Sequence, residues 1–121
     1  MNRLARHEYF QKQVADRLSK IPGVVPLSAS TTAPCDLVVL NPMGYPICLE
    51  IKTVGFGTTK KRLNGQLSTA QKAFRARLEG PEGIGAHFAV VTRSWGMDGA
   101  RVTVNSTNVV IKAWLEEHLA A

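Results

Sequence analysis

The sequence predicts one α/β domain in which a small mixed β-sheet is flanked by helices. Apolar residues recur at helical spacing near both ends of the chain, and short runs of β-branched and aliphatic residues lie between those ends. A helical segment separates the second of these runs from the third, as in a strand, helix, strand unit. The 121 residues suffice for one domain with a hydrophobic core, so we expect residues 1–121 to form a single domain.

Residues 3–20 are predicted to form the first helix. Phe10, Val14 and Leu18 recur every four residues, which places them on one apolar stripe. The Pro-Gly pair at residues 22–23 then ends the helix. Residues 28–34 are small and polar, which is typical of a loop.

Two strands are predicted next, at residues 36–40 and 46–52, with a turn between them. If they form an antiparallel hairpin about that turn, its register places Asp36 opposite Glu50. Side chains that lie directly opposite each other have Cβ atoms about 5 Å apart. The hairpin therefore brings two carboxylates together.

Side chains of the second strand are expected to alternate between the two faces of the sheet. Leu49 and Ile51 then point to one face, whereas Cys48, Glu50 and Lys52 point to the other. The face that carries Glu50 thus also carries a lysine.

The rest of the chain supplies a loop, a helix, a strand, a short strand and a closing helix. These elements are expected at residues 54–65, 68–79, 87–92, 101–104 and 108–119. Ser106 or Thr107 is expected to cap the closing helix. The third strand should join the sheet through a right-handed crossover from the second helix.

Composition and charge narrow the function classes. The net charge of +6 favours a polyanionic partner, and no apolar run approaches the length of a membrane span, so no membrane partner is expected. The charged N-terminal residues do not resemble a secretory signal. Two cysteines do not suggest a disulfide scaffold, so we expect free thiols and a cytoplasmic location, in a bacterium or a phage-infected host cell.

The paired carboxylates indicate a metal site. Asp36 and Glu50 would repel each other on one strand face unless a positive charge lies between them, and a divalent cation supplies that charge. Hard oxygen ligands suit Mg²⁺, for which Mn²⁺ can substitute. A metal held in this way activates water and acts as a Lewis acid, while Lys52 orients that water or stabilises developing negative charge. Two carboxylates and one lysine are the minimum set of side chains for phosphodiester hydrolysis of this kind.

The same residues resemble a known family. Asp36, thirteen residues and then Glu50, Ile51 and Lys52 resemble the D…ExK signature of the PD-(D/E)XK nucleases. Residues 67–74, which include Gln71, and residues 90–94 are similar to the VRR-NUC branch, the virus-type replication-repair nucleases. The resemblance covers about residues 8 to 94, and it departs from the usual proline–aspartate pair because Cys35 follows the proline.

The resemblance implies a restriction-endonuclease-like core and a Mg²⁺-dependent deoxyribonuclease. By this resemblance Asp36, Glu50 and the backbone carbonyl of Ile51 bind the metal, and Lys52 positions the nucleophile. Small stand-alone members of the branch are similar to Holliday-junction resolvases, so the resemblance also implies branched or structured DNA as substrate and a homodimer.

Two further site residues are implied by the resemblance, and both have structural alternatives. Gln71 would support the site, but Ser68 and Gln71 also fit a capping box. Glu8 would complete the site from the first helix, but it also suits the first turn of a helix as an acidic residue. The three histidines, His7, His87 and His118, show no metal-ligand spacing.

Other residues of the predicted site could instead be ordinary solvent-exposed residues. Glu50 and Lys52 could belong to a solvated strand face. Lys60, Lys61 and Arg62 could be a solvated loop, or they could contact the phosphates of DNA beside a nuclease site. At the level of function, the rivals to an active nuclease are a non-catalytic DNA-binding module of the same fold and a viral structural or assembly protein.

Overall fold

The computed structural model describes residues 3–29, 35–54, 67–79, 86–96 and 99–120. They form an α/β fold in which three helices flank a mixed five-stranded sheet, as predicted. The helices are α1 (Arg3–Ser19), α3 (Thr69–Glu79) and α4 (Val109–Leu119). The strands are β1 (Val25–Ser28), β2 (Leu37–Leu40), β3 (Ile47–Val54), β4 (His87–Gly96) and β5 (Gly99–Ser106), and they are adjacent in that order.

The strand pairing confirms the predicted hairpin. β2 and β3 are antiparallel, and Val38 is the partner of Cys48, which is the register expected from the turn. β3 and β4 are parallel and joined through α3, whereas β1 and β5 pair antiparallel with β2 and β4. The sheet is therefore mixed, and β3 is its central strand.

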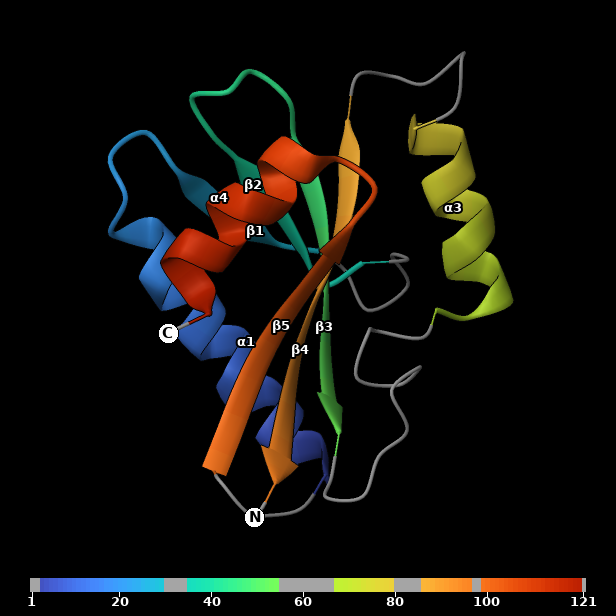
Figure 1. The fold of residues 1–121 in the computed structure, drawn as a ribbon. Helices are drawn as coiled ribbons and strands as arrows, with labels where there is room; N and C mark the ends of the chain where they lie inside the picture. The colour runs from blue at the N-terminus through green and yellow to red at the C-terminus, as the bar shows by residue number, and fades with distance from the viewer. Residues whose placement is uncertain (1–2, 30–34, 55–66, 80–85, 97–98, 121) are drawn as a thin grey trace.

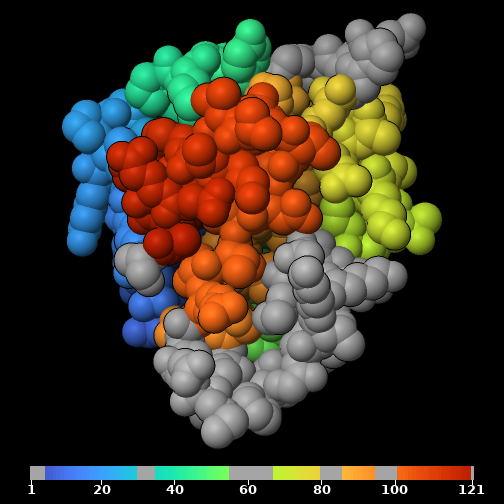
Figure 2. Space-filling view, in the orientation of Figure 1, coloured from blue at the N-terminus to red at the C-terminus, as the bar shows by residue number. Residues whose placement is uncertain are grey.

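Each face of the sheet has its own core (Figure 1). On one face α1 and α4 pack against alternate strand residues, including Leu49 and Ile51 of β3. On the other face α3 packs through Leu78, and Cys48 of β3 belongs to that cluster. Figure 2 shows α4 and α3 on opposite sides of β5, with α4 beside α1. The predicted alternation along β3 is confirmed, and it assigns Glu50 to the α3 face.

The turn before β3 is built by Asn41 and Gly44. The side-chain oxygen of Asn41 accepts a hydrogen bond from the Met43 N–H at 2.9 Å, and its amide nitrogen donates to the Tyr45 carbonyl at 2.8 Å. Gly44 has φ of 91°, which favours glycine because it has no Cβ. This turn fixes the hairpin register and hence which residues of β3 face Asp36.

Three sequence-based expectations about the elements were wrong. Ser28, expected in a loop, ends β1 instead and pairs with Leu37. β4 and β5 extend beyond residues 87–92 and 101–104 because they form a long hairpin, paired as far as Gly96 and Gly99. The cap of α4 is Asn108, and neither Ser106 nor Thr107. The expected loop at residues 54–65 lies almost wholly outside the described residues. Within the described ranges, no helix is long and apolar enough to cross a membrane.

The cap of α4 provides a test of the fold. The Asn108 side chain accepts hydrogen bonds from the N–H groups of Val110 at 3.0 Å and Ile111 at 3.1 Å. We expect Asn108→Ala to lower the free energy of unfolding by about 1 kcal/mol, because two helix-terminal donors lose their acceptor. Asn108→Asp retains an acceptor and is the matched control. Urea unfolding measures both variants, and an Asn108→Ala variant as stable as the wild type would contradict this assignment of the cap.

Candidate active site

Asp36 lies one residue before β2 and is held against β3 by its backbone and its side chain. Its N–H donates to the Leu49 carbonyl at 3.0 Å, and its own carbonyl accepts from the Ala29 N–H at 2.9 Å. Its Oδ2 accepts a hydrogen bond from the Ile51 N–H at 2.8 Å. The carboxylate is therefore fixed beside the middle of β3, as the predicted hairpin requires.

Glu50 and Lys52 lie on the same face of β3. Glu50 is 8% exposed, so it does not belong to a solvated strand face. The Lys52 Nζ lies 3.9 Å from the Glu50 Oε1, and the Lys52 side chain is partly exposed. The Glu50 carboxyl is also hydrogen-bonded to Asp36. Two acidic groups and one lysine thus meet at this point of the sheet.

A fourth side chain, His7, comes from α1. Its Nε2 lies 3.0 Å from the carbonyl oxygen of Ile51 and 3.6 Å from the Asp36 Oδ2. His7 was not singled out from the sequence, because its position relative to the other histidines suggested nothing. One signal was present: His7 precedes Phe10 by three residues, on the apolar stripe of the first helix that continues through Val14.

Electrostatics within this group favour a shared proton or a cation. Burial, together with the hydrogen bond and the charge of Asp36, raises the pKa of Glu50 to about 8. The charges of Lys52 and His7 act in the opposite direction and lower this pKa. Burial also acts to raise the pKa of Asp36, but hydrogen bonds from His7 and the Ile51 N–H outweigh it, so its pKa lies below its usual value. The hydrogen bond to Asp36 raises the pKa of His7, although burial opposes this.

The donor set fits a divalent cation. Among the described residues, no group of three His, Cys, Asp or Glu side chains is arranged so that it could hold a metal ion by itself. However, the Ile51 carbonyl oxygen and the Asp36 carboxylate both lie near the His7 Nε2, and burial and the neighbouring Asp36 raise the pKa of the Glu50 carboxyl. Oxygen donors of this kind, crowded enough to perturb a carboxyl pKa, are those that Mg²⁺ and Mn²⁺ bind.

Gln71 acts as a helix cap in this structure. Its Oε1 accepts a hydrogen bond from the Ser68 N–H at 3.0 Å, and the Ser68 Oγ accepts one from the Gln71 N–H at 3.2 Å. This reciprocal pair is the capping box that was the structural alternative for this residue. Among the described residues, Ser68 is the hydrogen-bond partner of the Gln71 carboxamide.

The other predicted site residues are Glu8 on the first helix and the basic run at residues 60–62. Glu8 is exposed on α1, whereas the neighbouring His7 lies against Asp36 and Ile51. Lys60, Lys61 and Arg62 lie outside the described residues.

Cys35 and Cys48 lie beside the acidic pair as free, buried thiols. Their side chains are hydrogen-bonded to each other, which raises the pKa of Cys35 and lowers that of Cys48. They belong to the core beneath α3.

The buried carboxyl predicts a dependence of stability on pH. Because the pKa of Glu50 is raised to about 8 in the folded protein, folding favours the protonated carboxyl, and this stabilisation is lost as the pH rises from about 4.5 to about 8. In EDTA we expect Glu50→Gln to match the wild type at about pH 4 and to be more stable above about pH 8. Urea unfolding across this range measures the difference. Glu117→Gln, on the exposed side of α4, is the matched control, and parallel profiles for Glu50→Gln and the wild type would refute the shift.

Comparison of the chain with models of protein families, with curated proteins and with solved structures found no match.

Proposed function

We propose that the protein is a metal-dependent DNA nuclease that hydrolyses phosphodiester bonds, with branched or otherwise structured DNA as its substrate. One observation carries the proposal: Asp36, Glu50 and Lys52, the residues of the D…ExK signature, meet on one face of the β2–β3 hairpin. A buried glutamate paired with a half-buried aspartate beside a lysine has no packing purpose, because the pair costs desolvation without filling the core. Such costs are typical of functional sites.

Asp36, Glu50 and the Ile51 carbonyl would hold a Mg²⁺ ion, with Mn²⁺ able to replace it. When bound, the ion would lower the pKa of a coordinated water and neutralise charge on the phosphate. Asp36 is already oriented for this task, because the Ile51 N–H fixes one of its oxygens. Glu50, whose pKa is raised by burial and by Asp36, would release its proton when the ion binds.

Lys52 would act on the reacting groups directly. Its Nζ lies 3.9 Å from the Glu50 carboxyl, at the partly exposed edge of the group, where a phosphate can approach. There it would orient the attacking water by a hydrogen bond and stabilise the negative charge that develops on the phosphate oxygens.

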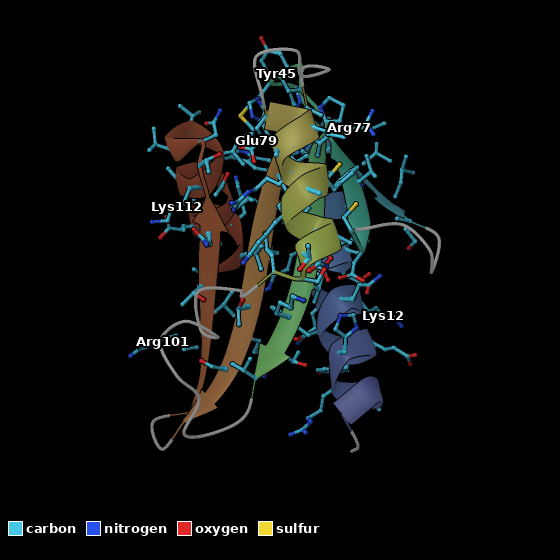
Figure 3. The ribbon with its side chains drawn as sticks, turned by 90° about the vertical axis from the view of Figure 1, so that its right-hand side faces the viewer. Lys12, Tyr45, Arg77, Glu79, Arg101 and Lys112 are labelled. Carbon is cyan, nitrogen blue, oxygen red and sulfur yellow. The ribbon has the colours of Figure 1, made fainter. Side chains whose placement is uncertain are left out.

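Basic residues near the site would hold the DNA through its phosphates. Lys72, Arg75 and Arg77 lie on α3, the helix over the Glu50 face, and Lys12 projects from α1 beside β3 (Figure 3). The net charge of +6 supports attraction to a polyanion. Lys60, Lys61 and Arg62 remain part of the proposal, because they follow β3 closely in sequence.

A homodimer completes the proposal, since branched DNA presents strands in pairs. Val25 and Leu40 are partners across β1 and β2. Val25 is 49% exposed, Leu27 is 47% exposed and Leu40 is 42% exposed. Apolar side chains gathered at one edge of a sheet are suited to contact with a second copy. A cytoplasmic location fits the free thiols Cys35 and Cys48.

Substitutions in the signature provide the first test of this function. We expect Asp36→Asn, Glu50→Gln and Lys52→Ala each to reduce cleavage of branched DNA by at least about a thousandfold. When catalytic groups act as a unit, removing one of them lowers the rate nearly as much as removing all of them. Single-turnover cleavage assays with Mg²⁺ measure the loss, and circular dichroism checks folding. Lys112→Ala on α4 is the control for removal of a lysine.

Two results would contradict the proposal in different ways. Normal cleavage by a folded signature variant would remove that residue from the mechanism. A wild type that binds branched DNA without cutting it, with Mg²⁺ or with Mn²⁺, would instead indicate the non-catalytic DNA-binding module.

Metal binding provides a second test, independent of DNA. An ion between Asp36 and Glu50 binds only the folded chain, so it stabilises the fold by mass action, by about 2.7 kcal/mol at a hundredfold excess over Kd. We expect millimolar Mn²⁺ or Mg²⁺ to raise the thermal midpoint of the wild type and to leave that of Glu50→Gln nearly unchanged. Differential scanning calorimetry measures both midpoints. An equal rise in the two proteins would place the ion elsewhere.

A further inference from the structure

The carbonyl oxygen of Ile51, the carboxylate of Asp36 and the imidazole of His7 meet at one point between α1 and the sheet. Nε2 lies 3.0 Å from the Ile51 oxygen and 3.6 Å from the Asp36 Oδ2. A hydrogen bond from the Ile51 N–H holds this carboxylate oxygen at 2.8 Å. The imidazole therefore contacts two of the three groups that the proposed function assigns to the metal.

We propose that His7 is itself a ligand of the metal ion, through Nε2, and that this nitrogen makes the site prefer Mn²⁺ over Mg²⁺. This inference rests on the proposed metal site at Asp36 and Glu50, and it names the ion which that site selects. It also replaces the expected acidic ligand from the first helix, Glu8, by the residue that precedes it.

The distances support coordination of one ion by the His7 Nε2, the Ile51 carbonyl oxygen and the Asp36 Oδ2. Neighbouring ligands of an octahedral ion with bonds of about 2.1 Å lie about 3.0 Å apart, and opposite ligands lie about 4.2 Å apart. The separations of 3.0 Å and 3.6 Å fall within this range, so an ion can enter between these atoms with small side-chain movements. On entry, the Nε2 lone pair would face the ion, and the ring proton would reside on Nδ1.

The chemistry of the donors sets the preference. Mg²⁺ binds oxygen and retains its waters, whereas imidazole suits ions later in the transition series. Mn²⁺ accepts both kinds of donor, so a site of two carboxylates, one carbonyl and one imidazole favours Mn²⁺ relative to an all-oxygen site. The core holds the imidazole in reach, because Phe10 and Val14 bury the same stripe of α1 against the sheet.

The alternative role for His7 makes the opposite prediction. As a protonated counter-ion of Asp36, the imidazolium would occupy the place of the metal and compete with it. Removal of His7 would then leave Mn²⁺ binding unchanged or strengthen it. The sign of the change in affinity therefore distinguishes a ligand from a competitor.

The experiment measures Mn²⁺ binding to the full chain by the electron paramagnetic resonance signal of free Mn²⁺, and Mg²⁺ binding by competition. For His7→Ala we expect Mn²⁺ affinity to fall at least about tenfold, since even outer-shell partners of metal ligands change affinity by about 10- to 100-fold. Mg²⁺ affinity should fall less, so the preference for Mn²⁺ declines. His7→Glu, which supplies oxygen, should also reduce that preference.

A spectroscopic readout identifies the ligand directly. Pulsed electron paramagnetic resonance of the Mn²⁺-loaded wild type should show coupling to an imidazole ¹⁴N nucleus, which His7→Ala abolishes. His118→Ala, on α4, is the matched control and should retain the coupling. His7→Gln keeps a side chain able to donate to the Ile51 carbonyl, so it replaces His7→Ala if the latter does not fold.

The outcomes separate this inference from the function on which it rests. If the wild type binds Mn²⁺ and Glu50→Gln does not, but His7→Ala binds as tightly as the wild type with the same ion preference, only the role of His7 is overturned. If the wild type binds no Mn²⁺, or Glu50→Gln binds it equally, the metal site and this inference are both overturned.

Discussion

The pairing of two carboxyl groups, one buried and one half-buried, is the constraint on which the rest of the site depends. Asp36 and Glu50 come from two strands, and burial raises the pKa of Glu50 to about 8. Two negative charges in contact, one of them buried, would be unfavourable, so a positive group or a proton must lie with them. The chain itself supplies positive or hydrogen-bonding groups beside the carboxyls, namely the Ile51 N–H, His7 and Lys52. A divalent cation would neutralise the two carboxylates more completely.

The hydrophobic cores maintain this unfavourable arrangement. Leu49 and Ile51 are buried against α1 and α4, so β3 cannot slip by one residue without exposing them. The same alternation directs Glu50 to the other face, and the turn at Asn41 and Gly44 fixes the position of Asp36 along β3. The apolar burial therefore offsets the electrostatic cost of the acidic pair.

The sequence predicted those parts of the fold and site that depend on local pattern. The hairpin register follows from the turn between the two strands and the face of Glu50 follows from alternation, and both predictions were confirmed. β1 escaped prediction because its side chains are largely exposed and Pro26 interrupts the strand pattern. Contacts between distant segments were also beyond reach: the choice of His7 over Glu8 depends on how α1 lies on the sheet.

α1 connects the core with the site. Phe10, Val14 and Leu18 bury one stripe of this helix against the sheet, and His7 extends that stripe to the Ile51 carbonyl. A ligand that binds His7, Asp36 and Ile51 together would therefore bind best to the conformation in which the first turns of α1 lie against β3. Binding and docking of this helix must then strengthen each other by the same free energy, because coupling between two equilibria is reciprocal. A site built across two elements in this way is complete only when the helix that forms the core is in place.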